Sequence, residues 1–171
     1  DWTKMSVFGR LNYNYKERYY VTFTARYDGA SNFAANNKWA FFPSAALKWN
    51  ISNENFLKDC NWIDDLSLRL SAGLTGNDAI STYRSLAVLS STTGGYLFDG
   101  SQPVAFYRSR LDSPDLTWEK TAAYNVAIDW SMFKGRLNIT AEAYKSKTTD
   151  LLMSLAVAAQ TGYTSRWTNI G

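Results

Sequence analysis

The 171-residue sequence predicts an all-β fold, an antiparallel sheet that forms a segment of a transmembrane β-barrel. Three observations lead to this fold class. Apolar and polar residues alternate with a period of two over six stretches, as in strands with one apolar face. Each stretch is close to the ~9–11 residues that a tilted strand needs to cross a bilayer, whereas strands of soluble proteins average ~5–6. The connections between the stretches alternate between short and long, as in membrane barrels.

The first two stretches predict a β-hairpin. Residues 6–15 and 19–28 alternate between apolar and polar side chains, and only residues 16–18 separate them. The connection 51–65 has room for a short helix at residues 54–58. Four further strands are predicted by the same alternation, at residues 41–50, 66–74, 121–132 and 136–143.

The apolar faces of these strands are expected to contact lipid. Aromatic residues bracket the apolar stripes, as Tyr19 and Tyr27 do in the second strand. Their separation spans ~20 Å for a strand that rises ~3.3 Å per residue at a tilt near 40°, close to the apolar band of a membrane barrel. The expected lipid-facing side chains include Val21, Phe23, Leu68, Leu70, Val126 and Ile128.

Alternation alone also fits a soluble β-sandwich, in which the apolar face packs against a second sheet. The alternative function is therefore a soluble carbohydrate-binding module. Detergent dependence separates the two, because a soluble module would stay monodisperse without detergent.

The composition excludes several other classes. Aromatic residues make up 16% of the chain and charged residues only 19%, which excludes intrinsic disorder. The absence of histidine and the single cysteine exclude a histidine triad and a disulfide framework, and they argue against a zinc site. The net charge of +3 is small and scattered, so no nucleic-acid partner is expected. Without a nucleophile–base pair, we expect no enzymatic activity, no metal and no cofactor.

The long connections are expected on one side of the membrane, the extracellular side, with the tight turns in the periplasm. The long connections are residues 29–38, 77–115 and 153–169, and the connection 51–65 is an exception on the other side. Residues 87–107 are predicted to form an extracellular hairpin, because their apolar content is weak; the alternative is a pair of additional membrane crossings.

Several short motifs carry a resemblance to a known family. They are YDGASNF (27–33), NKWAFFPS (37–44), WIDDL (62–66), TGN (75–77), LTWEKT (116–121), FKGRL (133–137), TTDLL (148–152) and NIG (169–171). In content and order these motifs resemble the SusC/RagA-type TonB-dependent transporters, nutrient importers in the outer membranes of Bacteroidota. The resemblance covers nearly the whole chain. It departs at Ala40, Lys48 and Ala127, where the family commonly has glycine.

The resemblance implies a barrel of ~22 strands around a plugged lumen. Residues 1–171 would then be part of one transmembrane β-barrel domain, an incomplete barrel that lacks the plug and the remaining strands. It also implies uptake of a glycan or peptide across the bacterial cell outer membrane. The implied partners are membrane lipid, a SusD-like surface lipoprotein over the extracellular loops, and TonB, which would bind segments outside this chain.

Two sets of residues are candidates for contact with the transported substrate. The candidate lumen-lining residues share the polar parity of the strands: Arg10, Asn12, Asn14, Arg26, Lys48, Arg69, Asp129 and Glu142. The candidate extracellular-loop contacts are aromatic residues of the long connections: Phe33, Tyr83, Tyr96, Phe98, Phe106 and Tyr107.

Overall fold

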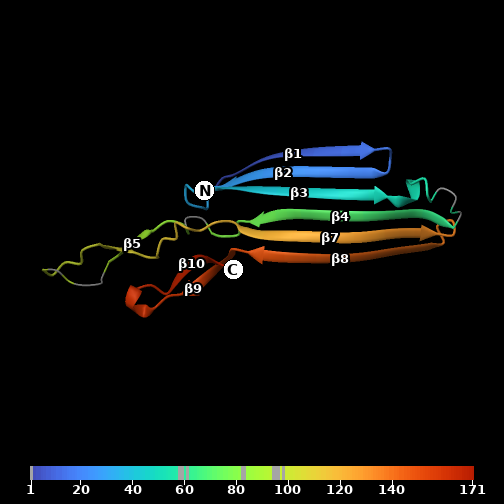
Figure 1. The fold of residues 1–171 in the computed structure, drawn as a ribbon. Helices are drawn as coiled ribbons and strands as arrows, with labels where there is room; N and C mark the ends of the chain where they lie inside the picture. The colour runs from blue at the N-terminus through green and yellow to red at the C-terminus, as the bar shows by residue number, and fades with distance from the viewer. Residues whose placement is uncertain (1, 58–59, 61, 82–83, 94–96, 98) are drawn as a thin grey trace.

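The computed structural model describes residues 2–57, 60, 62–81, 84–93, 97 and 99–171. Its main feature is one six-stranded antiparallel sheet with the strand order β1-β2-β3-β4-β7-β8 (Figure 1). The six predicted strands are confirmed, and each is longer than the stretch that predicted it. The strands are β1 Lys4–Tyr15, β2 Tyr19–Ala30, β3 Trp39–Asn50, β4 Ile63–Asn77, β7 Glu119–Met132 and β8 Leu137–Thr149.

The strand register gathers the apolar side chains on one face of this sheet, the apolar face. Leu11 lies opposite Phe23, and Leu70 lies opposite both Leu47 and Val126. This face is uncovered, so that even Leu11 is 69% exposed. The prediction of an apolar face outside any closed protein core is confirmed. Of the six side chains expected to contact lipid, one is half-buried, Leu68, and the others are exposed: Val21, Phe23, Leu70, Val126 and Ile128.

The remaining two sheets have two strands each and do not cover the apolar face. One pairs β5 Leu89–Thr92 with β6 Ala105–Arg108, and the other pairs β9 Leu151–Ala156 with β10 Ser165–Ile170. Figure 1 shows both beyond the same end of the large sheet. Among the described residues, no second sheet packs against the apolar face, as a β-sandwich would require. Within the same ranges, no helix has the length and apolarity needed to cross a membrane.

The opposite end of the sheet, the turn end, carries the tight turns at residues 16–18 and 133–136. Lys16 and Glu17 have φ values of 52° and 54°, and Phe133 and Lys134 have values of 57° and 58°. Left-handed residues at these positions let the turn follow the twist of the two strands it joins. The hairpins predicted at both places are confirmed.

The helix predicted at residues 54–58 is wrong in position. The structure has instead a one-turn 3₁₀ helix at Ile51–Asn53, directly after β3, and a turn at residues 55–57. Lys58 lies outside the described residues. The physical reason is that the Glu54 side chain contacts the ends of β2 and β3, as described below, and these contacts set the course of the chain after Asn53.

The loop end comprises residues 31–38, 78–118 and 150–171. Here β5 and β6 form a hairpin, while β4 and β7 pair directly with each other. The prediction of a hairpin at residues 87–107 without membrane crossings is therefore confirmed. The hairpin β9–β10 leaves the large sheet at Asp150, whose φ of 57° interrupts the extended backbone after β8.

A small apolar core, the rim cluster, holds the loop end together. Its most buried members are Phe33 and Leu116, each 1% exposed, and Trp118. The rings of Phe33 and Trp118 have centroids 5.3 Å apart, and the ring of Phe42 meets Trp118 edge-on at 5.6 Å. The other members of the rim cluster are Ala30 and Ile80.

The rim cluster lies where β3 and β4 part from each other. Their pairing ends at Ser44 and Gly73, although β3 begins at Trp39 and β4 continues to Asn77. The ring of Phe42 fills the space next to Gly76, where an added Cβ atom would lie 2.0 Å from Phe42 Cζ. The glycine is therefore required by close approach of the aromatic ring.

Candidate functional site

The second face of the sheet, the polar face, carries an ion pair in its middle. Arg69 on β4 donates two hydrogen bonds to Asp129 on β7, from Nε at 2.6 Å and from Nη2 at 3.1 Å. Thr140 on β8 donates a third hydrogen bond to Asp129, at 3.0 Å. A bidentate arginine–carboxylate pair fixes both side chains in orientation. Three neighbouring strands are thus linked on this face by one carboxylate.

Ala127 lies at the centre of these contacts and is almost fully buried. It is directly opposite Arg69 on one side and Glu142 on the other. Arg69 reaches diagonally past it to Asp129, while Asn125 donates in the other direction to Glu142. A small residue at position 127 leaves room for both diagonal contacts, which a larger side chain would obstruct.

Lys48 adds a second positive charge beside Arg69. It lies directly opposite Arg69, and the described residues include no carboxylate within ion-pair distance of it. Together with Tyr20 and Asn125 it lines a depression of about 220 Å³, to which Leu47 and Leu70 also contribute. A depression with an unpaired ammonium group and several hydrogen-bonding groups suits a polar or anionic ligand.

The other candidate lumen-lining residues lie on the same face. Their contacts are mostly with neighbouring side chains: Arg10 Nε with Thr24 Oγ1 at 3.2 Å, Asn12 Oδ1 with Thr22 Oγ1 at 2.9 Å, and Arg26 Nε with Asp28 Oδ1 at 2.7 Å. Asn14 accepts a hydrogen bond from the backbone N–H of Glu17 and so caps the turn. The structure places all eight residues on one face, and their contact with a substrate remains a prediction.

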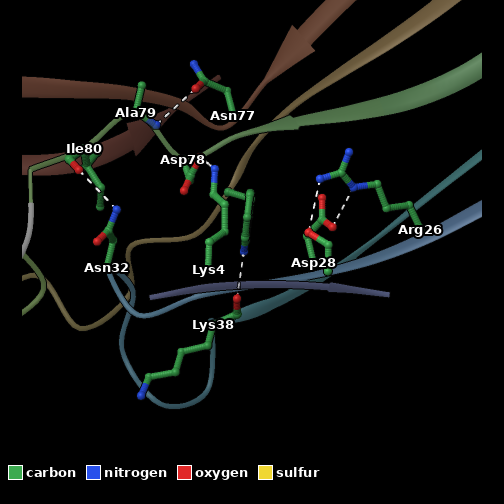
Figure 2. A network of polar contacts seen from close by, with 11 residues as sticks. Lys4, Arg26, Asp28, Asn32, Lys38, Asn77, Asp78, Ala79 and Ile80 are labelled. Atoms are coloured by element: carbon green, nitrogen blue, oxygen red, sulfur yellow. Dashed lines mark hydrogen bonds and ion pairs between the residues drawn. The ribbon is translucent and has the colours of Figure 1, made fainter. Parts of the chain in front are cut away.

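The polar face continues at the loop end into a second network, shown in Figure 2. Lys4 Nζ lies 2.6 Å from Asp78 Oδ1, so the start of β1 is tied to the segment that follows β4. Asn32 donates from Nδ2 to the carbonyl oxygen of Ile80 at 3.3 Å. The first contact therefore ties β1, and the second ties the connection 31–38, to the connection 78–118.

Most of the motifs that carry the family resemblance lie at the loop end, where their side chains hold neighbouring segments together. Glu119 accepts from Asn77 at 3.2 Å and from the backbone N–H of Leu152 at 3.2 Å. Asn169 both accepts from the N–H of Thr117 and donates to its carbonyl, each at 2.9 Å. These motifs therefore anchor the β9–β10 hairpin to the sheet, and the contacts described give them a structural role.

The candidate loop aromatics fall into three groups. Phe106 and Tyr107 on β6 are exposed, at 72% and 51%, and are accessible to a partner. Phe33 departs from the expectation, because packing against Trp118 buries it in the rim cluster. The remaining three candidates lie outside the described residues: Tyr83, Tyr96 and Phe98.

At the turn end, Glu54 links three separate segments. It accepts from Tyr19 Oη at 2.8 Å and from Trp49 Nε1 at 3.2 Å, and it pairs with Arg18 at 3.1 Å. The hydrogen bond from Tyr19 is the main reason that the pKa of Glu54 is lowered, and Trp49 and Arg18 act in the same direction, against the effect of burial. This contact explains how the long connection 51–65 is held against the end of the sheet.

The lumen-lining candidates chosen from the sequence left out Tyr20, Asn125 and Thr140, although alternation placed these residues on the polar side of their strands. In the structure, each of the three alternates with residues of the apolar face in its strand. The contribution of Asn169 had no such signal, since its partner Thr117 is 52 residues away. Across the described ranges, no group of three or more carboxylate or thiol side chains is close enough to hold a metal ion.

Comparison with known proteins agrees with this geometry. The sequence model of the family described as TonB dependent receptor-like, beta-barrel, matches residues 2–171. The chain is 44% identical over 98% of its length to TonB-dependent receptor P3 of Formosa agariphila, and 41% identical over 99% of its length to TonB-dependent receptor SusC of Bacteroides thetaiotaomicron. It spans only 16% and 17% of those two proteins. Among solved structures, it superposes on the RagAB peptide transporter with a TM-score of 0.85 at 32% identity, covering 99% of this chain and 18% of the other.

Proposed function

Because the chain belongs to the TonB-dependent receptor-like β-barrel family, we propose that it forms wall and extracellular loops of a SusC-type nutrient importer in the bacterial outer membrane. The observation that carries the proposal is the family match over residues 2–171, on a sheet with one uncovered apolar face and one charged face. Lipid covers the first face in this proposal, and the barrel lumen borders the second.

The proposed orientation places the loop end outside the cell and the turn end in the periplasm. Its support is the difference in connection length, since the long connections all leave the loop end apart from 51–65. Stacked aromatic pairs mark both ends of the strands, Tyr19 with Trp49 at the turn end and Tyr27 with Trp39 at the loop end. Aromatic residues at two levels are typical of the two membrane interfaces.

The proposed cargo is a glycan or a peptide, and the structural relative RagAB is a peptide transporter. The proposed partners are a SusD-like surface lipoprotein, which would cover the loop end, and TonB, which would act through segments outside this chain. Residues 1–171 would contribute to one barrel domain and carry out no chemistry themselves. The polar face would serve as a hydrated path, with its eight candidate residues as contacts for cargo or plug.

Uptake by cells that produce the full-length protein tests the import function. Cells would be given fluorescently labelled oligosaccharides or peptides, with and without TonB. We expect uptake of one cargo class that requires both the importer and TonB. Uptake that is equal without the importer would contradict the proposal.

Cysteine labelling of intact cells tests the orientation. Cys60 and any cysteine elsewhere in the full-length protein are replaced by serine, and a cysteine is then placed at Ser91 in the loop end or at Glu17 in the turn end. A membrane-impermeant maleimide is expected to label only the first variant. Labelling of only the second variant would reverse the topology.

A further inference from the structure

A pocket of about 160 Å³ at the loop end gathers three arginine side chains from three segments. Arg84 and Arg110 come from the two ends of the connection that carries the β5–β6 hairpin, and Arg166 comes from β10. The pocket is also lined by Tyr163, Thr164 and Trp167. Among the described residues, no aspartate or glutamate lines the pocket, so the positive charge of the three arginines is concentrated in one place.

The charges of this arginine pocket are not neutralised by the described part of the chain. The ion pairs there involve other residues, and none is formed by Arg84, Arg110 or Arg166. The Nε atoms of Arg84 and Arg110 are inaccessible to solvent and have no hydrogen-bond acceptor among the described residues. A buried charged donor without an acceptor is costly, so such an atom requires an explanation.

Neighbouring contacts hold the arginines in place. The guanidinium of Arg84 lies over the ring of Trp167, 5.8 Å from its centroid. Arg166 Nε lies 3.4 Å from Ser113 Oγ, and that hydroxyl itself donates to the carbonyl oxygen of Trp167 at 2.7 Å. Ser113 is buried, and Trp167 packs against the rim cluster. The pocket is therefore fixed before any ligand enters, which lowers the entropic cost of binding.

We propose that the arginine pocket binds an oxyanion, a carboxylate or sulfate group carried by the transported ligand. Guanidinium groups match the planar geometry and charge of such groups with paired N–H donors. A volume of 160 Å³ corresponds to about five water molecules at ~30 Å³ each, enough for one anionic group with the atoms that carry it. The hydroxyl of Thr164 adds a neutral donor. Only the source of the anion rests on the proposed function, because the pocket itself can be tested without transport.

Anion binding to the purified full-length protein in detergent tests the pocket. Thermal-shift titrations would use sodium glucuronate and sodium sulfate as probes, with glucose as the neutral comparison. We expect saturable stabilisation by at least one of the two anions and none by glucose. Arg110→Gln is expected to weaken the apparent Kd about tenfold or more, equal to ~1.4 kcal/mol. Binding should weaken with added NaCl, because salt screens the attraction between the arginines and the anion.

Arg136→Gln is the matched control, since it removes the same charge from the tight turn at the opposite end of the sheet. It should bind the anions like the unchanged protein. Arg110→Lys, which keeps the charge without the paired donors, should bind more weakly than arginine and more tightly than glutamine. Equal affinity of the Arg110→Gln and unchanged proteins, or no anion binding by a folded protein, would overturn the proposal. A protein that binds the anions but imports no cargo would instead count against the import function alone.

Discussion

Replacing Trp118 by alanine is expected to loosen the whole loop end. Trp118 is 2% exposed, packs against the rings of Phe33 and Phe42, and donates from Nε1 to the carbonyl oxygen of Lys38 at 3.1 Å. Truncation of a fully buried tryptophan costs about 3–5 kcal/mol, because the packing is lost and a cavity remains. Trp118→Phe keeps most of the packing and loses the hydrogen bond, which costs about 0.5–1.5 kcal/mol.

Hydrogen–deuterium exchange of the full-length protein measures this effect locally. A loss of ~3 kcal/mol raises the opening equilibrium of a segment by about 100-fold or more. We expect this acceleration in residues 31–38 and 113–117 of Trp118→Ala, while the middle of the large sheet keeps its protection. Trp62→Ala at the turn end is the control and should leave both segments unchanged. Exchange in residues 31–38 that changes less than threefold in Trp118→Ala would refute the role of the rim cluster.

Four further outcomes are expected. Val126→Arg, in the middle of the apolar face, should destabilise the assembled barrel by ~2–4 kcal/mol in urea titrations in lipid vesicles. Gly76→Val should cost ~1–3 kcal/mol through overpacking, whereas the control Gly9→Val, with no atom within 4 Å of its added Cβ, should be close to neutral in the same titration. Because the pKa of Glu54 is lowered in the folded protein, its contacts stabilise the fold at pH values above the ordinary glutamate pKa of ~4.3, and this stabilisation is lost as the pH falls through the folded-state pKa. Glu54→Gln should remove this step from the dependence of Tm on pH. An unchanged Tm–pH profile in the variant would contradict the role of Glu54. Deletion of residues 87–107 should leave a folded barrel by circular dichroism but reduce recovery of the surface lipoprotein in pull-downs; unchanged recovery would exclude the hairpin as a docking element.

The sequence was sufficient for the large sheet because alternation is a local property. Residues such as Val21 and Phe23 show their face through their immediate neighbours, and the register then only brings like faces together. The helix expected at residues 54–58 failed for a non-local reason. Glu54 is held by Tyr19 and Trp49 from two other segments, and no pattern within the connection indicates that contact.

The candidate site was predictable only where it follows strand parity. All eight lumen-lining candidates were placed on one face by alternation alone. Phe33 was expected to be exposed because it lies in a loop, but its burial depends on Trp118, 85 residues further along the chain. The arginine pocket is equally non-local, since Arg84, Arg110 and Arg166 come together only when the loops fold.

Because β3 and β4 separate at the loop end, the gap between them there is filled by side chains instead of being bridged by backbone hydrogen bonds. Beyond Ser44 and Gly73 the ladder between these strands stops, so their facing backbone groups lack each other as partners. Because lipid tolerates no unpaired backbone groups, the proposed orientation requires the hydrocarbon boundary of the membrane to lie on the turn-end side of this point. On the loop-end side of it, the Phe42 ring fills the space beside Gly76. At the loop end the two strands are therefore joined through packing of Phe42 and the rim cluster, whereas further toward the turn end they are joined by the backbone ladder.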